Sequence, residues 1–175
     1  MAGKSSGFSL PELMVVVVIV GVLAGLAIPN FTRNWEDERL NSSTKLLAGW
    51  LDDVRRQAIQ RSEPCRISVN TNNATLVPAI DNSCGLFANL NLKQEVTNNS
   101  QLQFQAIGNT PSTVVFTPRG TVWTNSADNV SQLEWRLRLG NGGSGLGRCL
   151  KLMTPLGLIR TGKERNGQCL YATAF

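Results

Sequence analysis

The chain has 175 residues, of which 42% are hydrophobic and 17% are charged, which is the composition of a folded protein. It contains no histidine, and its four cysteines form no Cys-x-x-Cys pair, so we expect neither a zinc site nor histidine-based acid–base catalysis. The formal net charge is +5, and from residue 136 onward seven basic residues stand against one acidic residue. Such an end attracts anions: an acidic protein surface, nucleic acid or lipid headgroups.

The N-terminus is dominated by an apolar run. Residues 13–28 carry no charge, and the stretch 8–31 is interrupted only by Glu12. A helix that starts at Phe8 and rises about 1.5 Å per residue can cross a hydrocarbon core of roughly 30 Å, whereas one that starts at Leu13 is marginal. A secretory signal peptide and a plain transmembrane anchor are alternatives. A signal peptide would need a small-residue cleavage site after the apolar core, and none is evident here.

The six residues before this run carry a resemblance. Gly-Phe-Ser-Leu-Pro-Glu at 7–12, followed at once by the apolar residues, resembles the prepilin signature of type IV pilins and type II secretion pseudopilins. The resemblance implies that a prepilin peptidase removes residues 1–7 by cutting after Gly7 and that Phe8 becomes an N-methylated N-terminus. Pro11 stands where Ile or Val is more usual, but proline costs little in the first turn of a helix.

The resemblance also implies roles for two residues of the helix. Glu12 matches the glutamate of the family that is used in fibre assembly, and Pro29 matches the proline that ends the membrane segment and kinks the helix. A carboxylate within an apolar segment is costly without a partner. In a fibre of packed helices, the α-amino group of Phe8 on a neighbouring subunit is a natural partner for Glu12. A carboxylate that reaches the headgroup region is the alternative.

Beyond residue 31 the apolar residues recur at spacings of three, four and seven, and charged residues fill the opposite face. This pattern predicts an amphipathic continuation, so that one helix runs from about Pro11 to about Arg61 over roughly 75 Å. We expect Trp35 and Trp50 to serve in packing. The expected apolar stripe consists of Trp35, Leu40, Leu46, Leu47, Trp50, Leu51, Val54, Ala58 and Ile59.

After residue 61 the pattern changes to the alternation of β-strands. A turn is expected at 118–120, a loop at the Gly-rich residues 140–147, and a turn at Thr154-Pro155. The Gly-rich loop contains Gly-x-Gly-x-x-Gly spacings, but it leads into a strand and not a helix, so it does not predict a dinucleotide site. The expected strands are 66–69 paired with 74–77 in a hairpin, 102–106, 113–117, 121–123, 133–139, and a last hairpin of 149–153 with 156–160.

The cysteines allow three pairings. We favour Cys65–Cys84 and Cys149–Cys169, because each closes a loop of about twenty residues around a predicted hairpin, although buried free thiols remain an alternative. The globular part of a pilin faces the oxidising periplasm, which favours disulfides. Each disulfide contributes on the order of 3 kcal/mol to stability.

These elements predict an α+β protein, and the resemblance implies the type IV pilin fold: a long N-terminal helix packed against an antiparallel β-sheet. The expected organisation is a leader (1–7), a transmembrane or fibre-core half-helix (8–30), an amphipathic half-helix (31–61) and a periplasmic β-rich domain (62–175). No phosphate loop or nucleophile motif is present, so we expect a structural protein without catalytic activity or cofactor.

The C-terminal sequence resembles the GspH/FimT branch of minor pilins and pseudopilins, whose members start or cap fibres. The resemblance implies other pilins, the prepilin peptidase and the inner membrane as partners, in a pilus or a secretion pseudopilus. Some members of that branch bind DNA through a Gly-Arg-x-Arg motif. Here Gly157 and Arg160 fit the motif, but Leu158 replaces its first arginine. The alternative function is therefore a DNA-binding tip subunit, with candidate contacts at Arg148, Lys151, Arg160, Lys163 and Arg165.

Overall fold

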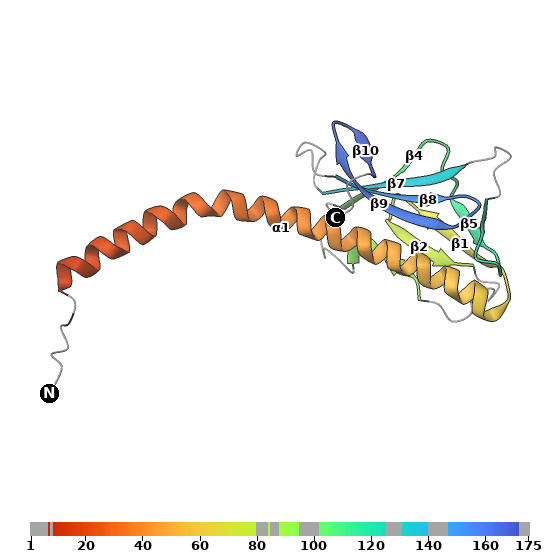
Figure 1. The fold of residues 1–175 in the computed structure, drawn as a ribbon, viewed down its shortest axis with the longest axis horizontal. Coiled ribbons are helices and arrows are strands. Elements are labelled where there is room, and N and C mark those ends of the chain that lie inside the picture. Colours follow the sequence, from red (N-terminus) through yellow and green to blue (C-terminus); the bar gives the residue numbers. More distant parts are fainter. Residues whose placement is uncertain are drawn as a thin grey trace. The chain divides into compact units, whose positions relative to one another are not determined.

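The structure is a computed structural model that describes residues 7, 9–79, 84, 88–94, 102–124, 131–139 and 147–171, apart from the side chains of 26–34. One long helix precedes a series of strands (Figure 1). The chain divides into two compact units, Met1–Glu36 and Asp37–Phe175, and each is described by itself. The elements are α1 (Leu10–Arg61), β1 (Cys65–Asn70), β2 (Thr75–Pro78), β3 (Leu90–Asn91), β4 (Leu102–Ile107), β5 (Thr113–Phe116), β6 (Val122–Thr124), β7 (Gln132–Leu139), β8 (Gly147–Met153), β9 (Leu158–Arg165) and β10 (Gln168–Leu170).

The helix α1 has the extent that the sequence predicted to within one residue. It starts after Ser9, whose carbonyl accepts a hydrogen bond from the N–H of Leu13 at 3.2 Å. It ends at Arg61, because Ser62 adopts a left-handed conformation (φ 56°) that a helix does not continue through. Pro64 follows two residues later and cannot extend the helix.

Within the second unit, one face of α1 is completely buried. Leu40, Leu47, Leu51, Val54 and Ala58 are each 0% exposed, and their spacings of seven, four, three and four residues place them on one stripe. The stripe is narrower than the sequence suggested. Trp35, Leu46 and Ile59 were expected in it but are 56%, 39% and 45% exposed.

The strands form two five-stranded antiparallel sheets, with the orders β3-β2-β1-β5-β6 and β10-β9-β8-β7-β4. The predicted fold, a long helix packed against antiparallel β-structure, is confirmed, and its strands divide between two sheets rather than one. Alternation along a strand shows which side chains face the core, but it carries no information about which strand lies beside it. Here β5 pairs with β1 and β4 pairs with β7, so strands that are adjacent in sequence belong to different sheets.

Both predicted hairpins are present in the structure. Strands β1 and β2 meet at Asn70↔Thr75, and Ala74 takes the left-handed conformation of the turn (φ 54°). Strands β8 and β9 meet at Met153↔Leu158 around the turn at Thr154-Pro155. The second strand of this hairpin was expected at 156–160, but β9 runs to Arg165 and returns as β10.

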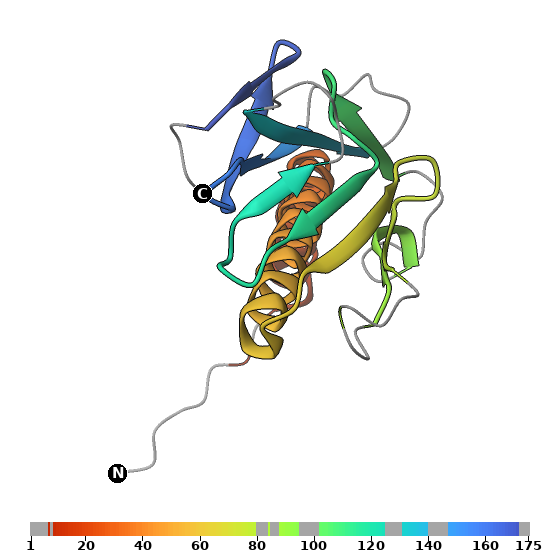
Figure 2. The ribbon, with the colours of Figure 1, turned by 90° about the vertical axis from the view of Figure 1, so that its right-hand side faces the viewer.

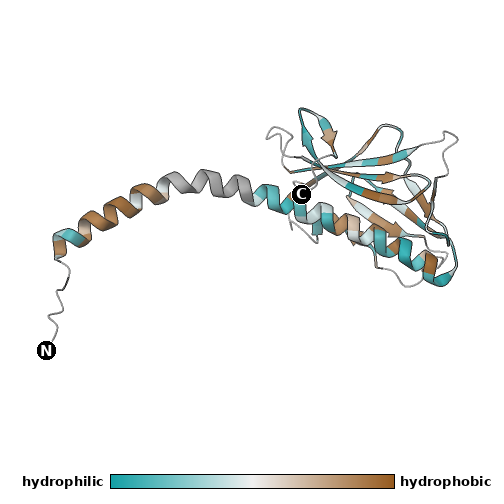
Figure 3. Cartoon of the chain, in the orientation of Figure 1, coloured by the Kyte–Doolittle hydropathy of each residue, from teal (hydrophilic) through white to brown (hydrophobic). Residues whose placement is uncertain are grey.

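The two sheets and the buried stripe of α1 share one core. Figure 2 looks along the second half of α1 and shows strands of both sheets around it. Alternate residues of β7 point into this core, as the sequence predicted: Leu133, Trp135 and Leu137 are at most 1% exposed. The hydropathy of α1 differs along its length (Figure 3): the described N-terminal residues are almost uniformly hydrophobic, whereas the second half alternates.

Candidate functional site

The first candidate site is the N-terminal part of α1. Glu12 lies in its first turn, and the apolar side chains that follow are all exposed within the described structure. From Leu13 to Leu23, every large apolar side chain is between 52% and 65% exposed. A patch of this size on a protein surface marks a site that another molecule covers.

The structure describes the other residues of the predicted N-terminal site only in part. Gly7 precedes the helix, and Phe8 lies outside the described residues. Pro29 is within α1, but its side chain also lies outside the described set, so its role as a kink stays a prediction. Among the described residues, no helix combines the length and the hydropathy that crossing a membrane requires.

The second candidate site is the basic C-terminal region, and its members differ in their surroundings. Arg148 is 3% exposed, and its Nη2 donates to both carboxylate oxygens of Asp37 at 2.8 and 2.9 Å. Asp37 lies on α1 and Arg148 on β8, so this ion pair joins the helix to the sheet inside the second unit. A buried, ion-paired guanidinium has a structural role and is not presented to DNA.

The remaining basic residues do not share one face. Directly opposed residues of antiparallel strands point to the same side, and Arg160 is opposite Lys151 whereas Lys163 is opposite Arg148. Arg160 and Lys163 therefore point to opposite faces, and by alternation Arg165 accompanies Lys163. Arg160, Lys163 and Arg165 are all exposed.

On the outer face of this sheet, Glu164 is the centre of a charge cluster. Arg138 Nε donates to Glu164 Oε2 at 2.8 Å, Arg138 Nη2 donates to Glu164 Oε1, and Arg136 Nη1 lies 3.4 Å from Glu164 Oε1. The hydrogen bond from Arg138 lowers the pKa of Glu164 below its usual range and raises the pKa of Arg138. Gly147 stands between Arg138 and Glu164 in the register, and any side chain there would occupy the space of the Glu164 carboxylate.

Tyr171 lies on the same outer face. Its hydroxyl donates to Glu134, and Lys151 Nζ is 4.2 Å from its ring centroid, so Lys151 also has a partner within the fold. Burial, together with the hydrogen bond to Glu134, raises the pKa of Tyr171 far above its ordinary value. No sequence pattern points to Tyr171, because its partners come from strands that are far away along the chain.

Both disulfides have the pairing that the sequence analysis favoured. Cys65 is bonded to Cys84 at the start of β1, and Cys149 on β8 is bonded to Cys169 on β10. The second bond crosses β9 at Gly162, which is opposite Cys149 in the register. Glu134, Cys149 and Cys169 come within 4.8 Å of one another, but the disulfide removes the thiolates that a metal ion would bind.

Arg55 is a further residue that sequence reasoning missed. Its Nε donates to the carbonyl of Gly120 at 2.8 Å, and its Nη2 donates to the carbonyl of Leu156 at 3.4 Å. It therefore ties α1 to both sheets at the turn that contains Gly157. Gly157 has a φ of 68°, and a Cβ on it would lie 2.7 Å from the carbonyl oxygen of Gly120, so the close approach requires a glycine.

Comparison with known proteins agrees with this geometry. Residues 3–28 match the family model of the prokaryotic N-terminal methylation motif. Over 33 residues the chain is 58% identical to the type II secretion system core protein G of Escherichia coli K12. That match spans 19% of this chain and only 23% of the relative's length, so it concerns one short segment of each protein.

The fold is similar to that of two proteins of known structure. The minor pseudopilin EpsH from the type 2 secretion system of Vibrio cholerae gives a TM-score of 0.52 at 10% identity, over 71% of this chain and 97% of EpsH. The type IV minor pilin FimU of Pseudomonas aeruginosa gives a TM-score of 0.52 at 16% identity, over 80% of this chain and 96% of FimU. At such identities the likeness concerns the fold alone, so the chain combines a fold similar to that of EpsH and FimU with the prokaryotic N-terminal methylation motif.

Proposed function

We propose that the chain is a structural minor subunit that helps to initiate or cap a type IV pilus or a type II secretion pseudopilus. The observation that carries this proposal is the exposed apolar surface of α1 between Leu13 and Leu23, with a carboxylate, Glu12, at its start. A surface of this kind is covered first by the inner membrane and then by the helices of neighbouring subunits. The role is structural and not catalytic.

In the proposed fibre, Glu12 pairs with the N-terminal amine of a neighbouring subunit. Cleavage after Gly7 creates that amine on Phe8, and N-methylation preserves its positive charge. Both ions are costly to bury alone, whereas together they are compensated. In this proposal, assembly through Glu12 therefore depends on cleavage after Gly7.

The proposal of a minor rather than a major subunit comes from the relatives of known structure. EpsH is described as a minor pseudopilin and FimU as a minor pilin, and both are covered almost completely by this chain. By analogy, the partners are other pilins of the fibre, and the prepilin peptidase acts on the precursor. The division into a leader (1–7), a fibre-core half-helix (8–30), an amphipathic half-helix (31–61) and a periplasmic domain (62–175) is part of the same proposal.

The test is the substitution Glu12→Gln, which removes the charge and keeps the size of the side chain. We expect a full-length, processed protein that stays with the membrane fraction and is lost from sheared fibres. Glu63→Gln is the matched control, because Glu63 is an exposed carboxylate just beyond the end of α1. Normal recovery of the Glu12→Gln variant in fibres would contradict the proposed role.

DNA binding is a second candidate, which the exposed side chains of Arg160, Lys163 and Arg165 on β9 favour. Because alternation separates Arg160 from the other two, gel-shift titration can identify the face involved. Binding that weakens in Lys163→Ala and Arg165→Ala, but not in Arg160→Ala, would assign it to the face shared with Arg148. An absence of any shift at low salt would remove this function.

A further inference from the structure

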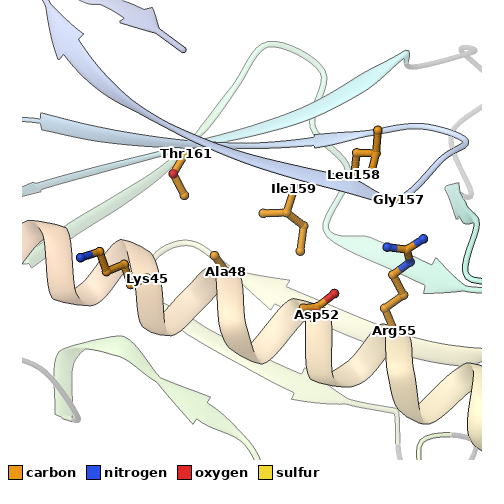
Figure 4. Close-up of a pocket in the computed structure, with 8 residues that line it drawn as sticks. All are labelled: Lys45, Ala48, Asp52, Arg55, Gly157, Leu158, Ile159 and Thr161. Carbon is orange, nitrogen blue, oxygen red and sulfur yellow. The ribbon is translucent and has the colours of Figure 1, made fainter. Parts of the chain in front are cut away.

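Within the second unit, strand β9 follows α1 in the opposite direction. At the start of the strand, a Cβ on Gly157 would lie 3.4 Å from Nε of Arg55, near the C-terminal end of the helix. Figure 4 shows how the two elements continue along the groove that they line together: Thr161 lies further along β9, on the side of Lys45. Each step forward along β9 is therefore a step back along α1, towards Asp37.

The hairpin of β9 and β10 consequently lies at the Asp37 end of the second unit. Lys163 is opposite Arg148 in the register, and Arg148 binds Asp37. Strand β9 then continues to Arg165 before the chain turns into β10. At about 3.3 Å per residue, the strand ends roughly 7 Å beyond the level of the ion pair. The hairpin therefore extends from the end at which the chain enters this unit.

One face of this hairpin combines two cations with an apolar side chain. Lys163 and Arg165 are exposed, and Glu164 between them points to the other face, where it is paired with Arg138. Leu170 is opposite Lys163 in the register, so it lies on the same face, and it is 42% exposed. Glu164 is the one acidic residue in the sequence 158–170. The face formed by Lys163, Arg165 and Leu170, called the hairpin face below, is therefore cationic and apolar.

The length of chain before this unit limits its distance from a membrane. The apolar run ends at Ile28, nine residues before Asp37, and the helix between them is about 14 Å long. The headgroup layer extends roughly 5–7 Å beyond the hydrocarbon core, and charges interact over about 8 Å at physiological salt. If the apolar run is inserted in a bilayer, the Asp37 end of the second unit is therefore within electrostatic reach of the headgroups.

We propose that the hairpin face binds anionic phospholipid headgroups while the chain is in the membrane, before it enters a fibre. This inference rests on the proposed function, which inserts residues 8–30 in the inner membrane. The cations of Lys163 and Arg165 attract the lipid phosphates, and Leu170 enters the boundary between headgroups and acyl chains. The contact orients the second unit at the membrane surface until assembly removes it.

Nucleic acid fits the hairpin face less well than a membrane does. A DNA duplex offers phosphates to Lys163 and Arg165, but it offers no apolar phase to Leu170. Binding to DNA also depends on the number of phosphates that the protein neutralises, and this face supplies two cations. A charged bilayer surface accommodates both kinds of side chain at once.

Nanodiscs that differ only in lipid charge test the proposal on the full chain. One set contains phosphatidylcholine alone, and the other contains phosphatidylcholine with phosphatidylglycerol. Both include a lipid with a spin label on its headgroup, which broadens the NMR signals of nearby amides. We expect the amides of residues 163–170 to be broadened in the anionic nanodiscs and not in the neutral ones. The broadening is expected to fade at 1 M salt, where the Debye length is about 3 Å.

Substitutions on β9 distinguish the two faces of the hairpin. A double variant, Lys163→Gln with Arg165→Gln, is expected to lower the ratio of bound to free hairpin by about tenfold or more. The reason is that each basic residue near an anionic membrane contributes roughly a factor of five. Arg160→Gln is the matched control and is expected to have no effect, because Arg160 is exposed on the same strand but points to the opposite face.

The possible results separate this proposal from the proposed function. Equal broadening in the two kinds of nanodisc, or equal effects of Arg160→Gln and the double variant, would overturn the lipid contact and leave the proposed function intact. Failure of the chain to enter either nanodisc would contradict the membrane-inserted state and both proposals with it. Equal broadening, together with a DNA gel shift that the double variant abolishes, would assign the face to nucleic acid and reject the lipid contact.

Discussion

Two stretches of the same helix make opposite use of apolar side chains. Between Leu13 and Leu23 the large apolar residues are all more than half exposed, whereas Leu40, Leu47 and Leu51 are 0% exposed. Both stretches are rich in aliphatic residues, but the second also carries charged residues on its exposed face. The difference is that the second stretch is covered by sheets of its own chain, while the cover of the first is not among the described residues. The first stretch is therefore the part of the molecule that we assign to contacts with other molecules.

Polar contacts differ between the two stretches as well. The second stretch is attached to the strands by Asp37, which binds Arg148, and by Arg55, which binds two backbone carbonyl groups. At the start of the first stretch the charged side chain is that of Glu12. One half of the helix is thus held by interactions within the chain, and the other half carries one charge for which we propose a partner on a neighbouring subunit.

The largest expected effect is on stability, and it distinguishes apolar residues that hold the fold together from those that act in assembly. Leu47→Ala is expected to lower the free energy of unfolding by about 3 kcal/mol, because it leaves a cavity in a fully buried position. Leu13→Ala is expected to change the free energy of unfolding by less than about 0.5 kcal/mol and instead to reduce the amount of protein recovered in fibres. Denaturant titration in detergent, followed by tryptophan fluorescence, measures both. Leu46→Ala, at a neighbouring and 39% exposed position, is the control.

A smaller effect is expected from the ion pair that joins α1 to β8. Asp37→Asn is expected to lower the free energy of unfolding by about 2 kcal/mol, because it leaves the buried Arg148 cation without its carboxylate. Arg148→Met is expected to cost less, since the side chain of Asp37 is 37% exposed and can be solvated. The same titration gives both values, with Asp53→Asn as an exposed control on the same helix. A larger cost for Arg148→Met than for Asp37→Asn would contradict this reading.

The smallest effect concerns pH. Because the folded-state pKa of Glu164 is lowered, its contribution is fully present above the unfolded-state pKa of about 4.3 and is lost as the pH falls through the folded-state pKa. Glu164→Gln removes this dependence, so the variant is expected to lose less stability than the wild type on acidification below pH 4.3. Urea titrations at a series of pH values test it. Glu63→Gln should retain the wild-type profile.

Local patterns in the sequence were sufficient for most individual elements. The alternation at 133–139 predicted β7, and the spacing of apolar residues predicted α1 to within one residue. The favoured cysteine pairs are also those of the structure, because each closes a short loop around a hairpin. In all these cases the deciding residues are close together in the sequence.

Features that depend on distant residues could not be predicted in this way. Nothing in the sequence of β5 indicates that it pairs with β1, and so the division into two sheets was missed. In the sequence, Arg148 resembles the other basic residues of the C-terminal region, which are expected at the surface. Its burial depends on Asp37, which is 111 residues away. Likewise, the separation of Arg160 from Lys163 becomes visible only once the register of β8 and β9 is known.

The central claim is that the apolar helix is kept in the mature protein and exists to pack against other subunits. The most direct test is mass spectrometry of the mature protein, purified from cells that have an active prepilin peptidase. We predict a chain that begins with N-methylated Phe8 and retains Glu12 and the entire apolar run. An N-terminus located after Ile28 would mean that the run is discarded as a signal peptide, and it would contradict the account.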